Sequence, residues 1–204
     1  MIRLLKPFLK LPYELDQVRI NLNKNNYDGI NLYFQDESRF GLMTHIGKCL
    51  TSRGVKPIVK YKHCFDNTYL YGSFSPINGD AFIYEIAGVS SNIFFNYLEE
   101  FSKYKPREMK IVIIDNAGFH SLKDYTIPGN IKLIRIPPYS PELNPSEKIW
   151  AFIKQRFKNK VYQSIEELKN WLHGFVVQEL LPDLVKSITH DKKYIDCFKA
   201  QFEV

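Results

Sequence analysis

The sequence predicts an α/β fold in which a mixed, five-stranded sheet carries helices on both faces. Two observations lead to this prediction. Three segments rich in β-forming residues come first, and Asn78-Gly79 between the second and third is typical of an antiparallel hairpin. Two further strands follow through crossover connections, and short right-handed connections favour a parallel arrangement of the first of these with strand one.

Length and composition limit the classes of protein that the chain can be. Its 204 residues, 45% apolar and 15% aromatic, suffice for one domain with a proper core, which excludes a largely disordered chain. No apolar run approaches the roughly 20 residues of a membrane helix, and the N-terminus lacks the features of a signal peptide. The scattered Cys49, Cys64 and Cys197 predict reduced thiols in a cytosol.

The chain is expected to consist of a short arm followed by one domain. Pro7 and Pro12 break any long helix in residues 1–28, so we expect an N-terminal arm there and a single domain with C-terminal helices over residues 29–204. Within this domain, runs of β-forming residues predict strands at 30–35, 69–75, 81–86, 110–114 and 131–136. The fourth is nearly all apolar, which is typical of a central strand buried on both faces.

Capping residues and apolar spacing predict three helices. The first follows Ser90 and runs to about residue 104. The second opens at Asn144-Pro145-Ser146-Glu147, with Asn as N-cap and Glu at the third helical position. The third follows Ser164 and ends before Pro182, and the last 20 residues are expected to form a short helix or a tail.

Three acidic residues stand at the ends of these predicted elements. Asp36 is expected to end the first strand and Asp115 the buried strand. If the two strands are parallel neighbours, these ends lie about 4.8 Å apart, where like charges need a counter-charge such as Mg²⁺ or Mn²⁺. Glu147, in the first turn of the next helix, is able to face both aspartates across the sheet. Three carboxylates so arranged suit a two-metal phosphoryl-transfer site.

Each acid also has a purely structural explanation, and spacing alone does not decide between the two. Asp36 and Asp115 are typical strand-ending turn residues, and Glu147 fits the last position of a capping box. His120, five residues after Asp115, is either a helper near the metal ions or leaving group, or a structural residue. Asn116 either orients an acid or contacts phosphate, or it belongs to a turn.

Longer motifs surround all three acids. They are Tyr33-Phe-Gln-Asp36-Glu-Ser38, Ile113-Ile-Asp115-Asn-Ala-Gly-Phe-His120 and Pro137-Pro-Tyr-Ser-Pro-Glu-Leu-Asn-Pro-Ser-Glu147-Lys-Ile-Trp150. Together these motifs resemble the catalytic domain of bacterial insertion-sequence transposases related to mariner. The resemblance covers roughly residues 30–160, and the 32 residues from Asp115 to Glu147 fit the short final spacing of that family.

This resemblance implies an RNase H-like fold and a DDE triad of Asp36, Asp115 and Glu147 that binds two Mg²⁺ or Mn²⁺ ions. It implies a DNA transposase that cleaves double-stranded DNA at transposon ends by metal-activated water. The freed 3′ hydroxyl then attacks target DNA, commonly at a TA dinucleotide. Relatives act as dimers, so a homodimer without membrane contact, in the bacterial cytosol or nucleoid, is expected.

The chain departs from the family pattern in places. Full-length relatives usually carry N-terminal helix-turn-helix modules that read transposon ends, and residues 1–28 offer no room for them, so a fragment, a split-frame product or a decayed copy is expected. Leu50 stands where family members often have Trp. The alternative function is therefore a catalytically silent DNA-binding or dimerisation fragment. A third possibility is a nuclease of the same fold that acts on RNA–DNA hybrids.

Two basic stretches without acidic residues contribute to the net charge of +6. Such stretches are either solvated surfaces or binding sites for the phosphates of a polyanion. With the family resemblance in view, we expect them to flank the path of the DNA. The DNA-binding candidates are Lys48, Arg53, Lys56, Lys60 and Lys62 in the first stretch, and Lys154 and Arg156 in the second.

Overall fold

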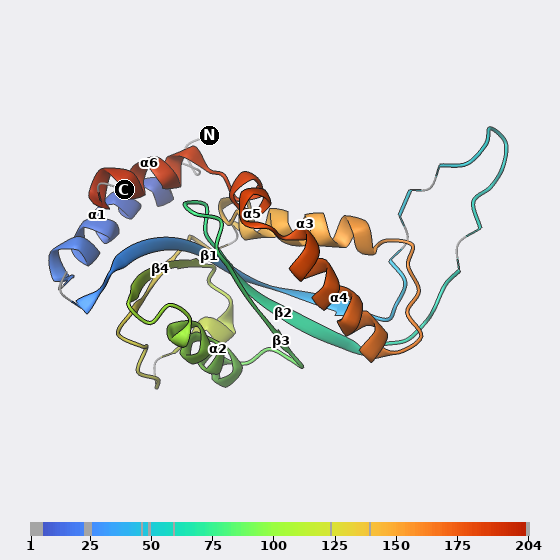
Figure 1. The fold of residues 1–204 in the computed structure, drawn as a ribbon, viewed down its shortest axis with the longest axis horizontal. Coiled ribbons are helices and arrows are strands. Elements are labelled where there is room, and N and C mark those ends of the chain that lie inside the picture. Colours follow the sequence, from blue (N-terminus) through green and yellow to red (C-terminus); the bar gives the residue numbers. More distant parts are fainter. Residues whose placement is uncertain are drawn as a thin grey trace.

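The computed structural model describes residues 6–22, 26–45, 47–48, 50–58, 60–122, 124–138 and 140–202 (Figure 1). Five strands form one mixed sheet in the order β3-β2-β1-β4-β5. β1 pairs antiparallel with β2 and parallel with β4, so the predicted α/β class and the predicted parallel pair are confirmed. The strands are β1 Gly29–Gly41, β2 Asn67–Phe74, β3 Ala81–Ile86, β4 Glu108–Ile114 and β5 Ile131–Arg135.

Helices lie on both faces of this sheet (Figure 1). The last four strands begin and end within two residues of their predicted positions. The α-helices are α1 Lys6–Asn21, α2 Ser91–Lys103, α3 Ser146–Phe157, α4 Ile165–Glu179, α5 Pro182–Ile188 and α6 Lys192–Phe202, with short 3₁₀ turns η3 Gly118–His120 and η4 Pro141–Leu143. Two N-caps are confirmed, because Ser90 accepts a hydrogen bond from the Ile93 amide and Ser164 from the Glu167 amide.

Successive side chains of the central strands point to opposite faces of the sheet, and this alternation divides the core into layers. Tyr33, Val112 and Ile114 pack against α2 on one face. Leu32 and Phe34, on the other face, belong to a cluster with α1 and α6, which lie side by side (Figure 1). Further along this same face, the far half of β1 packs with β2 against α3, α4 and α5. Even-numbered residues of β1 therefore face α1, α6 and α3, whereas odd-numbered ones face α2.

The N-terminal segment differs from the prediction. Pro12 lies inside the 16-residue helix α1, so the expectation that proline prevents a long helix here is wrong. Proline removes one backbone hydrogen bond from a helix, but Leu11, Leu15 and Val18 are buried in the core against α6 and offset this loss. A chain boundary at residue 28 stays a prediction, although α1 packs onto the same core as the sheet.

Strand β1 is also longer than predicted, and Asp36 does not end it. The strand runs five residues further, to Gly41, because its second half pairs with β2, where Asp36 lies opposite Gly72. The parallel pairing with β4 stops earlier, at Phe34 opposite Ile113. Asp36 therefore lies beyond the end of β4 on a strand that continues.

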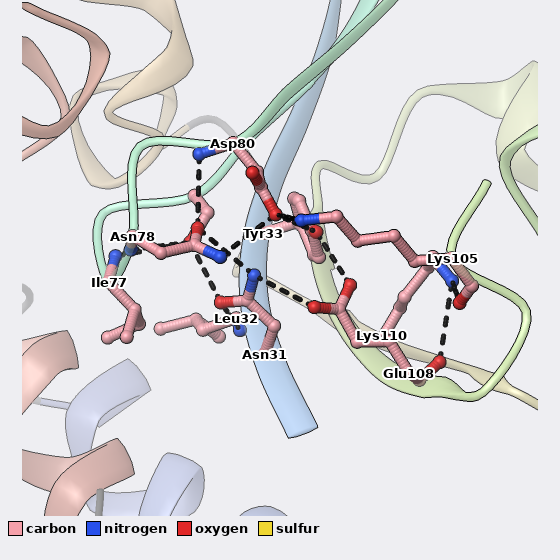
Figure 2. Close-up of polar contacts among 10 residues, drawn as sticks. Asn31, Leu32, Tyr33, Ile77, Asn78, Asp80, Lys105, Glu108 and Lys110 are labelled. Carbon is pink, nitrogen blue, oxygen red and sulfur yellow. Dashed lines mark hydrogen bonds and ion pairs between the residues drawn. The ribbon is translucent and has the colours of Figure 1, made fainter. Parts of the chain in front are cut away.

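The amino ends of β1 and β4 carry a network of buried polar groups (Figure 2). Tyr33 Oη donates a hydrogen bond to Glu108 Oε1 at 2.7 Å. The wholly buried Lys110 donates from Nζ to the backbone oxygens of Lys105 and Glu108, at 2.9 and 3.3 Å, and burial lowers its pKa to about 8. Lys105 in turn forms an ion pair with Asp80 on the β2–β3 turn. The charges and hydroxyl of this network thus have partners.

Three further features concern the chain outside the sheet. Between Gly41 and Asn67 the described residues form neither helix nor strand, and this excursion reaches away from the body of the molecule (Figure 1). Cys64 and Cys197 are free thiols, whereas Cys49 lies outside the described residues. Among the helices in the described ranges, none has the length and apolar character needed to span a membrane.

Candidate active site

Strand register brings Asp36 and Asp115 together in spite of the longer β1. The last parallel pair is Phe34 opposite Ile113, and Asp36 and Asp115 each follow their member of this pair by two residues. Extending the register by one full pleat therefore predicts that the two aspartates lie side by side, and the charge of Asp115 does act on Asp36. Asp115 directly follows the end of β4, as predicted.

Asp36 is the most deeply buried of the three acids. Only 9% of this residue is exposed, and its Oδ2 is buried without a hydrogen-bond partner among the described residues. Burial, together with the negative charges of Glu147, Glu37 and Asp115, raises the pKa of Asp36 to about 8. A buried carboxylate oxygen among like charges is costly until a proton or a cation satisfies it.

Asp115 is held in a different environment. Its side chain is 44% exposed, and Oδ1 accepts a hydrogen bond from the Ala117 amide at 2.9 Å and lies 2.7 Å from His120 Nδ1. The hydrogen bond with His120 is the largest of the effects that lower the pKa of Asp115, and it outweighs partial burial. Asp115 is therefore an ionised, accessible carboxylate beside the buried Asp36.

Glu147 is positioned by the way helix α3 starts. The N-cap of α3 is Pro145, so Glu147 is the second helical residue and the predicted capping box with Asn144 as N-cap is wrong. Asn144 instead joins the helix to the sheet, since its Nδ2 donates to the Gln35 backbone oxygen at 2.9 Å and its Oδ1 accepts from the Ser146 amide at 3.2 Å. Because Gln35 directly precedes Asp36, these bonds hold the first turn of α3, with the exposed Glu147, next to that aspartate.

The donor set suits a hard divalent cation. Within the described part of the chain, no three His, Cys, Asp or Glu side chains form a ready-made metal cage. Mg²⁺ and Mn²⁺ need few protein ligands, however, because they are bound by one or two carboxylates and otherwise keep water. The unpartnered Oδ2 of Asp36, with the charges of Asp115 and Glu147 acting on it, is the kind of oxygen that such an ion would satisfy.

Two charged residues near the site were not singled out from the sequence. Glu37 Oε1 lies 3.1 Å from His120 Nε2, and Arg135 donates to the backbone oxygens of Asp115 and His120. Strand alternation was the available signal for Glu37, since an acid next to Asp36 must face the opposite side of β1. Nothing in the local sequence of Arg135 marks it. His120 itself is wholly buried, in direct contact with Asp115.

The loop after Asp115 borders open space. A cavity of about 420 Å³ is lined by Asp115, Asn116, Ala117, Ile136, Pro137, Pro138 and Ser140. The Asn116 amide donates to the backbone oxygen of Ile136, which ties this loop to the end of β5. A role of Asn116 in orienting an acid or contacting phosphate stays a prediction.

The predicted DNA-binding residues fall into two groups. Lys48, Arg53, Lys56 and Lys60 are exposed on the excursion between β1 and β2, and Lys154 and Arg156 are exposed on α3. Lys62 differs from these, because its Nζ donates to the backbone oxygens of Tyr162 and Gln163 at 3.0 and 2.6 Å. Lys62 therefore fastens the base of the excursion to the segment before α4.

Sequence comparison finds a matching family model and related curated proteins. The family model described as DDE superfamily endonuclease matches residues 31–169. The Tc3 transposase of Caenorhabditis elegans is 27% identical over 176 residues, which cover 80% of this chain and 54% of that protein. Uncharacterized protein y4pE/y4sA of Sinorhizobium fredii is 36% identical over 59 residues, 28% of this chain and 44% of that protein. The chain thus spans about half the length of these curated relatives.

Solved structures share the fold. The Mos1 mariner paired-end complex with Mn superposes with a TM-score of 0.67 at 14% identity, covering 97% of this chain and 62% of that chain. The Mos1 strand transfer complex gives 0.65 at 13%, covering 98% and 62%. The predicted RNase H-like architecture is therefore confirmed. Since the family model covers well over half of the sequence and includes all three motifs, the chain belongs to the DDE superfamily endonucleases, and it resembles the Tc3 transposase in sequence and Mos1 in fold.

Proposed function

We propose that this chain cleaves DNA at transposon ends and joins the ends to target DNA with the help of two Mg²⁺ or Mn²⁺ ions. The observation that carries the proposal is the buried, unpartnered Oδ2 of Asp36, which lies where the charges of Asp115 and Glu147 also act. Asp36, Asp115 and Glu147 would hold the ions. Bound ions of this kind lower the pKa of water and neutralise charge that develops on a phosphate.

The chain's own residues supply the framework for this chemistry. β1 and β4 present Asp36 and Asp115 at one edge, and Asn144 holds the first turn of α3 against the same edge. The exposed lysines and arginines of the excursion and of α3 would flank the path of double-stranded DNA and bind its phosphates. The solved Mos1 complexes, which are paired-end and strand transfer complexes, support transposon-end DNA, target DNA and a homodimer as partners. A preference for TA targets and a location in the bacterial cytosol or nucleoid remain predictions.

The test is nicking of supercoiled plasmid by the purified chain, with Mg²⁺, Mn²⁺ or EDTA. We expect nicking only with the divalent ions, and a loss on the order of 1,000-fold for Asp36→Asn, Asp115→Asn and Glu147→Gln, because groups that act as a unit fail together. The exposed Asp66 and Glu142 provide matched controls, Asp66→Asn and Glu142→Gln, which should retain activity. Metal-dependent nicking that survives all three site changes would overturn the proposal.

A catalytically silent DNA-binding or dimerisation fragment is the second candidate. It is favoured by the exposed Lys48, Arg53 and Lys56 on the excursion, which suit DNA binding whether or not cleavage follows. This candidate predicts salt-sensitive DNA binding with no cleavage at any concentration of divalent ion. The third candidate, a nuclease for RNA–DNA hybrids, predicts cleavage of a hybrid duplex and no cleavage of plasmid DNA.

A further inference from the structure

We propose that Glu37 and His120 form a buried clamp on Asp115, which holds this carboxylate in the orientation needed to bind a divalent ion. The inference rests on the proposed function, because it deepens the role of one of the three acids. It assigns both residues as positioning residues, and it excludes His120 as a group that acts directly on DNA.

Contacts on both ring nitrogens of His120 support the clamp. Nδ1 lies 2.7 Å from Asp115 Oδ1, and Nε2 lies 3.1 Å from Glu37 Oε1. The His120 side chain is wholly buried, and its ring centroid is 4.3 Å from that of Phe94 and 4.5 Å from that of Phe119. With both nitrogens facing carboxylates and the wholly buried ring packed against two aromatic side chains, the imidazole is fixed in place and has no access to a substrate.

The clamp selects one oxygen of Asp115. Oδ1 is engaged by His120 and by the Ala117 amide, while the side chain as a whole remains 44% exposed. Oδ2 is therefore the oxygen that we expect to bind metal. Arg135 donates to the backbone oxygens of Asp115 and His120, so the loop that carries both residues is attached to β5.

Glu37 connects the clamp to the other acids. Asp36 and Glu37 are neighbours on β1 and face opposite sides of the sheet, so one strand offers a metal ligand on one face and the anchor of the clamp on the other. Gln35 links the two sides, because its Nε2 donates to Glu37 Oε1 at 2.8 Å and its backbone oxygen accepts from Asn144. Partners that orient a metal ligand in this way typically contribute about 10- to 100-fold to metal affinity.

Two near-isosteric substitutions of His120 separate the two halves of the clamp. In His120→Asn the amide nitrogen takes the place of ring Nδ1, which keeps a donor to Asp115 and removes the contact with Glu37. In His120→Gln the amide nitrogen takes the place of ring Nε2, which keeps the contact with Glu37 and removes the donor to Asp115. Both replacements are neutral and polar, so a merely structural role predicts similar effects of the two on metal binding.

The readouts are Mn²⁺ affinity, by calorimetry and by electron paramagnetic resonance of unbound Mn²⁺, and thermal unfolding of the metal-free protein. We expect His120→Gln to weaken Mn²⁺ binding by about 10- to 100-fold and His120→Asn to weaken it much less. The exposed His173 on α4 gives matched controls, His173→Asn and His173→Gln, with unchanged affinity. Equal affinities of the two His120 variants would overturn the clamp.

Glu37→Gln keeps the test valid if either His120 variant does not fold. This substitution preserves the shape of the Glu37 side chain and removes its charge. We expect weaker Mn²⁺ binding than in the wild type, together with an unchanged fold. Wild-type Mn²⁺ affinity of this variant would overturn the anchoring role of Glu37. The proposed function fails separately, if the wild type does not bind Mn²⁺ or if Asp36→Asn binds it as tightly as the wild type.

Discussion

The two ends of the parallel pairing between β1 and β4 both carry clusters of charged groups, and the clusters differ in how their charges are compensated. At the amino end, Lys110 donates to two backbone oxygens and Tyr33 donates to Glu108 (Figure 2). At the carboxyl end, Asp36 Oδ2 is buried without a partner among the described residues, and burial, together with the charges of Glu147 and other acids, raises the pKa of Asp36.

The presence or absence of partners distinguishes a structural network from a candidate binding site. A buried polar group contributes to stability only when its partners are present, and an unpaired one costs free energy. The amino-end network is therefore expected to stabilise the fold, whereas the buried, unpartnered Asp36 at the other end lowers the stability of the metal-free protein and is stabilised when a cation binds. Three substitutions test whether the two clusters differ in this way.

The largest effect is expected for Asp36→Asn in the absence of divalent metal. Because the pKa of Asp36 is about 8 in the folded chain and about 4 in the unfolded one, the folded wild type binds the extra proton and loses stability as pH rises from about 4 to about 8. Asn does not titrate, so the melting temperature of the variant relative to wild type should increase across this range. At about 1.4 kcal/mol per pKa unit, the pH-dependent gain reaches several kcal/mol at pH 8.

The measurement is thermal unfolding in EDTA at intervals from pH 4 to pH 8, repeated with Mn²⁺. Added Mn²⁺ should raise the melting temperature of the wild type and not that of Asp36→Asn. Parallel pH curves for the two proteins would show that Asp36 is not destabilising, and the contrast between the two ends would then fail.

An intermediate effect of opposite sign is expected for Lys110→Met at the amino end. Met keeps the length of the side chain near Phe101, where Lys110 Nζ lies 5.5 Å from the ring centroid, but it leaves the backbone oxygens of Lys105 and Glu108 without this donor. The free energy of unfolding in urea should fall by about 1–3 kcal/mol, with Mn²⁺ affinity unchanged. Lys103→Met, an exposed change on α2, is the control. A Lys110→Met chain as stable as wild type would mean that burying the ammonium costs as much as its hydrogen bonds contribute.

The smallest effect is expected for Tyr33→Phe. This change removes one hydroxyl and its 2.7 Å hydrogen bond to Glu108, and leaves the ring packed against Phe101, whose centroid lies 5.0 Å away. Chemical denaturation should register a loss of about 1 kcal/mol. A larger loss, or any change in Mn²⁺ affinity, would show that the two ends of the strands are coupled rather than independent.

Local signals accounted for much of the fold. Ser90 and Ser164 cap their helices as predicted, and β3 spans residues 81–86 as predicted, because caps, turns and apolar runs act over a few residues. The prediction that Asp36 ends the first strand was wrong, since the length of β1 depends on pairing with β2, which follows a long excursion. The prediction at Pro12 was wrong because the packing that supports α1 comes from α6, at the other end of the chain.

The order of the strands along the chain, the three acid-bearing motifs and the family to which they point could all be read from the amino-acid sequence. The contact of Glu37 with His120, 83 residues away, and the bond by which Asn144 holds α3 to β1 became visible only in the folded chain. The two kinds of feature depend on interactions of different range along the chain. Backbone preferences and capping act between near neighbours, whereas burial, register and the pairing of charges depend on which distant segments the folded chain brings into contact.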